Sequence, residues 1–275
     1  MSSALELRLR MPVAHFRNPF TFFHAQTYPL PPRSTVVGML QSQLGGFLGK
    51  PVLDLGEHLQ VSIKGRAEAV TFNYVRMVKG RVLLTGKGLL NEQTIERKKV
   101  LLPLLISQRA PTYQQELLGL ELLIHVRGDA NLEDLRSALT SPRKAISLGR
   151  GEDVAFLEEE PRIVRLSSDR RGGVIGLGLG TYVPEELVAG GLVVDGGVGY
   201  LMLEPSYVDA SGRRILSVYA QLGEKPRPGI SGHTILRYVE PRGHLELSLD
   251  GVELDFAEGV KDPLFWIGSF GRPVN

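Results

Sequence analysis

The chain contains no cysteine, which excludes disulfide bonds and metal sites with thiolate ligands. It also lacks a long apolar run: the longest, residues 100–106, contains a proline and is far shorter than the roughly 18–20 residues of a membrane-spanning helix. The first residues alternate between apolar and polar side chains, so we expect no signal peptide. These absences predict a cytoplasmic protein without a membrane partner.

Histidine is scattered rather than clustered. The 6 histidines lack the His-x-x-x-His and Glu-x-x-His spacings of common metal sites, so we expect no metal ion. No motif indicates another cofactor. The glycine-rich run at residues 172–180 matches neither the phosphate-loop nor the dinucleotide-binding pattern, and it is interpreted as a β-turn region.

The net charge is only +2, but the charges are distributed unevenly. Residues 61–109 contain ten basic side chains against three acidic ones, whereas residues 240–275 contain seven acids against three basic residues. Phe72, Tyr74 and Tyr113 are interleaved with the basic stretch, a combination typical of nucleic-acid grooves. A solvated basic face is the plainer alternative. The ten basic residues are Lys64, Arg66, Arg76, Lys79, Arg81, Lys87, Arg97, Lys98, Lys99 and Arg109.

Periodicity predicts an α+β fold with a β-α-β-β-α-β order in residues 1–166. Apolar alternation favours strands at residues 5–11, 59–74, 117–127 and 162–166. Helices are expected from residue 35 to about 45 and at 132–139, the second capped by Asn131. This is the order of a ferredoxin-like or RRM-like domain, whose open sheet face is often used to bind RNA.

Two additions to this plan are expected. Residues 75–113 are basic and punctuated by glycine, which predicts a β-hairpin arm, or thumb, inserted between core strands. Residues 167–275 form a smaller β-rich C-terminal region, in which Asp250-Gly251 predicts a two-residue hairpin turn between alternating segments of residues 245–256.

The most informative segment runs from Tyr28 to Leu40. Its paired prolines form a stiff lead-in, after which Ser34 fits a helix N-cap and Val36, Leu40 and Leu44 fit one buried stripe. A helix start with Arg33 at its mouth suits a phosphate, because free N–H groups and a partial positive charge gather there. The alternative is an ordinary helix start that binds no ligand.

Two further motifs flank this segment: Ala14-His15-Phe16-Arg17 before it, and Leu148-Gly149-Arg150-Gly151-Glu152-Asp153 after the second predicted helix. In this order the three motifs resemble the Cas-five family of CRISPR proteins, which are subunits of type I Cascade surveillance complexes. The resemblance covers the first 50 residues and the Leu-Gly-Arg region well, and the C-terminal third hardly at all. The wording of residues 27–32 is most similar to the type I-B branch.

The resemblance implies a RAMP (ferredoxin-like) domain and a non-catalytic role in CRISPR antiviral defence. The protein would bind RNA, cap the 5′ handle of the mature crRNA and nucleate assembly of the ribonucleoprotein complex. Its partners would be crRNA, a backbone (Cas-seven type) subunit and a large (Cas-eight type) subunit, with target DNA reached only through the complex. The expected RNA-binding residues are Phe16, Arg17, Tyr28, Arg33, Ser34, Tyr74, Arg76, Lys79, Arg81, Arg109, Gly149 and Arg150.

Several alternatives stay open. The type I-C branch of the family cleaves precursor crRNA without metal, through Tyr, Lys and His side chains, so His15, His24 and Tyr28 are candidates for a metal-independent endoribonuclease. A related RAMP subunit of a type III effector is a third reading. The wider superfamily uses glycine-rich loops to approach RNA, which gives residues 172–180 an alternative role. Arg150 has one too, as a structural ion pair with Glu152 or Asp153.

Overall fold

The computed structural model describes residues 2–18, 21, 24–44, 59–85, 88–89, 105–189, 192–194, 197–203, 207–208, 214–215 and 233–268. The elements in chain order are β1 (Ser3–Ala14), β2 (His24–Ala25), α1 (Arg33–Gln43), β3 (Leu59–Arg66), β4 (Ala69–Thr85), β5 (Gly88–Leu89), β6 (Leu105–Gly128), α4 (Leu132–Thr140), β7 (Phe156–Leu157), β8 (Arg162–Gly176), β9 (Gly180–Pro184), α5 (Glu185–Ala189), β10 (Leu192–Val194), β11 (Val198–Leu203), β12 (Tyr207–Val208), β13 (Arg214–Ile215), β14 (His233–Val239) and β15 (His244–Ala257).

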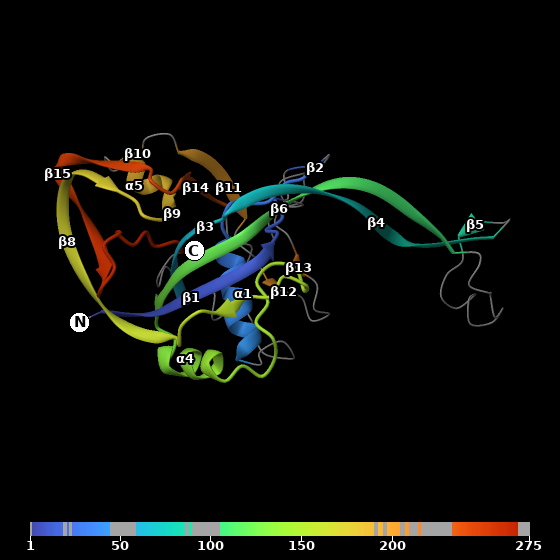
Figure 1. Ribbon diagram of the computed structural model, residues 1–275, viewed down its shortest axis with the longest axis horizontal. Coiled ribbons are helices and arrows are strands. Elements are labelled where there is room, and N and C mark those ends of the chain that lie inside the picture. Colours follow the sequence, from blue (N-terminus) through green and yellow to red (C-terminus); the bar gives the residue numbers. More distant parts are fainter. Residues whose placement is uncertain are drawn as a thin grey trace.

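One long, curved sheet organises the described part of the chain (Figure 1). Its strand order is β10-β15-β8-β1-β6-β3-β9-β14-β11, and every pairing along this path is antiparallel. A mostly antiparallel sheet with few helices agrees with the predicted α+β class. β8 runs through residue 166 without interruption, so no break in secondary structure marks the expected boundary. The division into residues 1–166 and 167–275 stays a prediction.

Alternation along the central strands separates an apolar face from a polar one. In β1, Leu5, Leu7 and Leu9 are fully buried on the apolar face, and their partners in β6 are also aliphatic. Helices α1 and α4 contribute apolar side chains to the same core, among them Leu40 and Leu135. The expected strands at residues 5–11 and 117–127 are confirmed, because they lie within β1 and β6.

The polar face of the same strands is also covered, which corrects the expectation of an open RNA-binding sheet. Glu6, Ser62, Lys64 and His125 lie on this face and are at most 2% exposed. Residues 262–268 pack beside them: the Phe265 amide donates to Ser62 Oγ (3.2 Å), and Lys64 Nζ donates to the Asp262 carbonyl (2.8 Å). The chain's own C-terminal segment thus occupies part of the surface that an RRM-like plan leaves free.

The predicted arm is present as a long pair of antiparallel strands. β4 pairs with β6 from Ala69↔Leu118 to Leu83↔Leu105, with a register shift between Lys79 and Val82. Figure 1 shows the two strands projecting away from the body of the protein. Residues 90–104 of the arm lie outside the described residues.

The two predicted helix starts have different outcomes. Asn131 caps α4 as expected, because its side chain accepts the Glu133 amide at 3.1 Å. Helix α1 begins one residue before Ser34, with Pro32 at the N-cap and no side-chain capping bond, so the Ser34 cap was wrong. The Pro32 carbonyl already accepts the first amide of the helix, from Thr35 at 2.9 Å. Leu44 is 40% exposed and does not belong to the buried stripe.

The predicted hairpin at Asp250-Gly251 was also wrong. β15 is one strand from His244 to Ala257, and it pairs with β8 on both sides of these two residues. The pairing shifts register between Leu247 and Val252, so the dipeptide marks an irregularity within a strand and not a chain reversal. The long β8 provides a partner for both segments, which a local turn signal cannot anticipate.

Candidate functional site

Three segments meet at the base of the arm: the loop after β1, the start of the β4–β6 pair, and the loop after α4. Asp153 joins two of them. Its carboxylate is 2% exposed and accepts the amides of His15 (3.2 Å) and Arg150 (3.0 Å) as well as the Arg150 guanidinium (2.6 Å). This buried carboxylate fixes the relative position of the two loops.

Arg150 reaches the third segment. Its Nη1 donates to Glu116 of β6 at 3.0 Å, and its Nε lies 3.3 Å from the exposed Glu152. The hydrogen bond that Arg150 donates to Asp153 is the main cause that raises the pKa of Arg150 above its usual value. The structural ion pair is therefore present. Much of the guanidinium binds carboxylates of the protein itself.

Gly149 is required where it stands. Its φ of +114° lies in the left-handed region, which disfavours a side chain. A Cβ atom would also lie 3.0 Å from Asp153 Oδ2 and 3.1 Å from the His15 carbonyl. The glycine therefore permits the close approach of the two loops, and the structure gives this reason without any ligand.

Exposed aromatic side chains form a row across the base of the arm. Phe72, Tyr74 and Tyr113 are 65%, 51% and 51% exposed. Tyr74 and Tyr113 are paired across the ladder with ring centroids 5.4 Å apart, and the His24 ring lies 6.2 Å from Tyr113. Large aromatic side chains exposed together in this way are unusual unless they contact a partner. We call these four residues the aromatic row.

Arg17 supports the loop beside this row. It is exposed, and its guanidinium donates to the carbonyl of Thr21 at 2.6 Å and to that of His24 at 3.5 Å. A backbone bridge between Arg17 and Thr27 closes the loop. Arg17 thus remains accessible to solvent next to His24 of the aromatic row.

Other predicted contacts are buried instead. Phe16 and Tyr28 are each 2% exposed and belong to the main core, and Arg33 is 8% exposed. Arg33 Nη2 donates to the Leu59 carbonyl at 2.8 Å, and Ser34 is half-buried in the first turn of α1. The proline-rich segment is therefore an anchor of the fold, and the expected anion site with Arg33 at its mouth is not open to solvent.

Tyr182 holds the proline-rich segment in place through hydrogen bonds to its backbone. Its hydroxyl donates to the Leu30 carbonyl at 2.7 Å and accepts the Leu30 amide at 3.1 Å. Tyr182 is fully buried, and burial raises its pKa well above the usual value. A residue in β9 thus satisfies the backbone of a segment 152 positions earlier, which the sequence does not reveal.

The three candidate catalytic residues are separated by burial. His15 is 4% exposed, and its Nδ1 lies 2.7 Å from the Gln115 carbonyl. Burial lowers the pKa of His15 and raises the pKa of Tyr28 well above its usual range. Only His24 of this set is exposed. A base and an acid acting together on one 2′-hydroxyl are not assembled by these three side chains.

The basic residues of the arm are placed by strand register. Arg76 lies opposite Pro111, Lys79 opposite Gln108 and Arg109 opposite Val78, while Arg81 follows Lys79 in β4 at the register shift. Arg76 is two positions beyond Tyr74, and residues two apart in a strand share a face. The basic stretch therefore continues outward from the aromatic row along the arm.

A carboxylate of the chain itself binds the backbone of the glycine-rich run. Asp262 Oδ2 accepts the amides of Gly178 (3.0 Å) and Leu179 (3.4 Å). Among the described residues, no group of three or more His, Asp or Glu is placed to hold a metal ion. No helix in the described ranges is long and apolar enough to cross a membrane.

Sequence reasoning noticed Phe72 and Tyr113 but did not place them in the site. The usable signal was their position: strand pairing aligns Tyr113 with Tyr74, and alternation keeps Phe72 on the face of Tyr74. Glu116 and Gln115 carried no signal, because their roles depend on the fold.

Comparisons with known proteins show what this chain is similar to. The family model described as CRISPR-associated protein (Cas_Cas5) matches residues 4–185, which is more than half of the chain. A chain of a CRISPR RNA-guided surveillance complex is 16% identical, with 86% of this chain and 90% of that chain covered and a TM-score of 0.53. A Cas protein crystal structure is 19% identical (87% and 95% covered, TM-score 0.46), and a CRISPR protein from Archaeoglobus fulgidus is 11% identical (95% and 98%, 0.46). No curated protein sequence matches the chain.

Proposed function

The chain belongs to the Cas-five family of CRISPR-associated proteins, and on this premise we propose that it is an RNA-binding subunit of a Cascade-type complex. In this role it caps the 5′ handle of the mature crRNA and nucleates assembly. The aromatic row at the base of a basic arm carries the proposal. Aromatic faces stack on splayed bases while basic side chains neutralise the phosphates that follow.

The fold supports the same role. The strand order β8-β1-β6-β3, with α1 and α4 contributing to the core on one face, supports the proposal of a ferredoxin-like RAMP domain. The fold is also similar to that of a chain from an RNA-guided surveillance complex. We propose crRNA, a backbone (Cas-seven type) subunit and a large (Cas-eight type) subunit as partners, with target DNA contacted only through the complex.

We further propose that the subunit does not cleave RNA. Burial of His15 and Tyr28 supports this, because neither side chain is presented to a substrate. Arg17 and the aromatic row are proposed to contact the handle directly. Arg150 and Gly149 act on the same surface by holding its loops together. Phe16, Tyr28, Arg33 and Ser34 then act as core or helix residues beneath it.

The direct test is incubation with 5′-labelled repeat RNA in EDTA, followed by native and denaturing gels. We expect a native shift with intact RNA, and an affinity that falls about tenfold or more between roughly 50 and 200 mM salt because phosphate contacts release counterions. A scrambled RNA of equal length is the control for handle recognition. A discrete cut that is lost in His24→Ala would instead establish the endoribonuclease alternative.

Removing the aromatic row should weaken RNA binding without unfolding the protein. Each stacked base contributes about 1–3 kcal/mol, so removing two stacking rings with Tyr74→Ala and Tyr113→Ala should lower affinity by about thirtyfold or more. The two rings touch, so the double variant need not equal the sum of the single variants. Fluorescence anisotropy with labelled repeat RNA measures the change.

The matched control is Phe156→Ala, which removes an aromatic ring that is 56% exposed on β7. It should leave RNA affinity unchanged. Unchanged binding in the double tyrosine variant would show that RNA does not bind at the base of the arm. An equal loss in Phe156→Ala would show that the effect is not local.

A further inference from the structure

The first part of β4 is a strand edge that the rest of the described chain leaves open. Residues 69–75 pair with β6 on one side, and no other described strand pairs with them (Figure 1). Val70, Phe72 and Tyr74 are 52%, 65% and 51% exposed, so other parts of the protein do not cover these side chains. An open edge presents backbone N–H and C=O groups that can pair with a further strand.

This edge lacks the features that usually protect an edge strand from pairing with another chain. The sequence of residues 69–75, Ala-Val-Thr-Phe-Asn-Tyr-Val, contains no charge, proline or glycine, and most of its side chains are β-branched or aromatic. The register shift of β4 comes only later, between Lys79 and Val82. An exposed, uncharged strand edge of this composition is expected to pair with another strand.

The edge is complementary to itself in antiparallel pairing. If Phe72 lies opposite Phe72 of a second copy, Val70 of each copy lies opposite Tyr74 of the other, and alternation keeps all of them on one face. Cross-strand pairs of aromatic and β-branched side chains are favourable. The same register places Glu68 opposite Arg76 at both ends of the pairing, so the charges also match.

The structure limits how far such a pairing can extend. β9 already occupies the edge of β3 at Lys64 and Gly65, so a second copy has access only to the part of the chain that follows. Glu68 lies at this limit, with a side chain that is 64% exposed. It accepts Arg10 at 3.2 Å, and a carboxylate has enough acceptor sites to bind a second cation as well.

We propose that two copies of this chain associate through this edge, with their β4 strands antiparallel and Phe72 at the two-fold axis. The second copy provides a strand for the open backbone groups, apolar side chains for Val70 and Tyr74, and opposite charges at both ends. The association is closed, because both copies use the same segment. The inference does not depend on RNA binding, because it uses the backbone edge and not the ring faces that stack on bases.

The test is the mass of the RNA-free, intact protein measured by sedimentation equilibrium. We expect the average mass to rise from that of one chain towards twice that value between roughly 1 and 200 µM, because a single strand pair is a small interface and therefore a weak one. Phe72→Lys places two ammonium groups opposite each other at the axis, so it should raise the dimer dissociation constant about tenfold or more. The matched control, Phe156→Lys at a 56% exposed ring on β7, should associate like the wild type.

A charge exchange tests the register itself. Arg76→Glu alone and Glu68→Lys alone each bring like charges together at both ends, so each should raise the dissociation constant about tenfold or more. An equal mixture of the two variants should form a dimer with a dissociation constant within about threefold of the wild type, since each variant supplies the charge that the other lacks.

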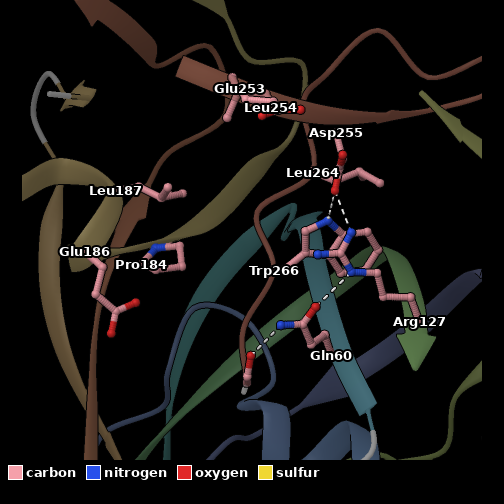
Figure 2. A pocket seen from close by; sticks show the side chains of 11 residues that line it. Gln60, Arg127, Pro184, Glu186, Leu187, Glu253, Leu254, Asp255, Leu264 and Trp266 are labelled. Carbon is pink, nitrogen blue, oxygen red and sulfur yellow. Dashed lines mark hydrogen bonds and ion pairs between the residues drawn. The ribbon is translucent and has the colours of Figure 1, made fainter. Parts of the chain in front are cut away.

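Trp266 checks that every variant is folded. It is the single tryptophan of the chain, its Nε1 donates to Asp255 at 2.7 Å, and the Arg127 guanidinium lies 4.0 Å from its ring centroid, as Figure 2 shows. Arg127 lies at the end of β6 opposite to the arm, so the emission of Trp266 should be the same in all variants.

Four outcomes would overturn the proposal. The first is the mass of one chain up to about 300 µM protein. The second is growth beyond two copies, because the proposed pairing is closed. The third is association of Phe72→Lys equal to that of the wild type. The last is an equal mixture of the two charge variants that associates no better than either variant alone.

Discussion

Asp153→Ala should lower the free energy of unfolding by about 3–5 kcal/mol, the usual result of removing one partner from a buried ion pair. The carboxylate is almost fully buried and accepts two backbone amides as well as the Arg150 guanidinium. Alanine would leave the His15 and Arg150 amides without an acceptor and Arg150 with fewer counter-charges. Urea unfolding followed by circular dichroism measures the loss.

Two variants separate the charge from the hydrogen bonds. Asp153→Asn keeps an oxygen acceptor but loses the charge, so its loss should be intermediate. Glu152→Ala removes a carboxylate that is 69% exposed, and it should cost no more than about 1 kcal/mol. A stability of Asp153→Ala within about 1 kcal/mol of the wild type would show that the two loops are held by other contacts.

The same variants distinguish support from contact in the proposed RNA site. If Arg150 acts by holding the loops, Asp153→Ala and Arg150→Ala should lower RNA affinity together. If Arg150 instead binds a phosphate directly, Asp153→Asn would keep RNA affinity while Arg150→Ala loses it. Arg17→Ala combined with Arg150→Ala should lower assembly on crRNA under either reading.

Much of the fold followed from local pattern. Alternation identified β1 and β6 because one face of each strand meets a helix and must be apolar. Asn131 capped its helix because the capping bond joins residues only two apart. The arm followed from glycine punctuation and charge, and the structure forms it by antiparallel pairing of β4 with β6. In each case the deciding contact is local or repeated along the strand.

The errors came from contacts made with distant parts of the chain. Asp250-Gly251 has the composition of a turn, but pairing with β8 keeps β15 extended through it. The proline-rich motif suits an anion site by itself, but Tyr182 and Leu59 bury it from other strands. The open face of the predicted sheet is covered by residues 262–268, far away in the sequence. No local pattern encodes these partners.

The sequence indicated what kind of site to expect, but it indicated less well which residues belong to the site. Mixed aromatic and basic residues in the arm pointed to the region of the proposed site, and strand register then aligned Tyr74 with Tyr113. Phe16 and Tyr28 are buried, although both belong to the most informative motifs. Some motif residues thus lie beneath the surface of the proposed site, whereas others are exposed on it.

A buried polar network in the central sheet gives the second large prediction. Glu6 is 2% exposed, accepts the Arg162 guanidinium at 2.7 Å, and lies 3.1 Å from His125 Nε2. Burial alone raises the pKa of Glu6, but the hydrogen bonds from His125 and Arg162 outweigh it and lower the pKa from 4.5 to about 2. Burial is also the main cause that lowers the pKa of His125 below 6.5. A proton on its Nδ1, which is buried without a hydrogen-bond partner, would have no acceptor.

Both shifts make acid destabilising. Since the folded pKa of Glu6 is below its unfolded value, its contribution of about 3 kcal/mol is fully present above pH 4.5 and is lost as the pH falls towards about 2. The unfolded chain also takes up a proton on His125 more readily than the folded chain, so stability begins to fall below about pH 6.5. Acid unfolding should therefore proceed through two windows.

Glu6→Gln should test the lower window directly. At pH 7 the variant should be less stable than the wild type by about 3 kcal/mol, because glutamine carries no charge for Arg162. The difference should shrink as the pH falls below 4.5, since the wild-type carboxylate becomes protonated while glutamine does not titrate. Glu159→Gln, at a side chain that is 55% exposed, should follow the wild-type curve throughout. A difference that stays constant from pH 7 to pH 3 would mean that Glu6 contributes through packing and not through its charge, because only a charge makes stability depend on its own titration.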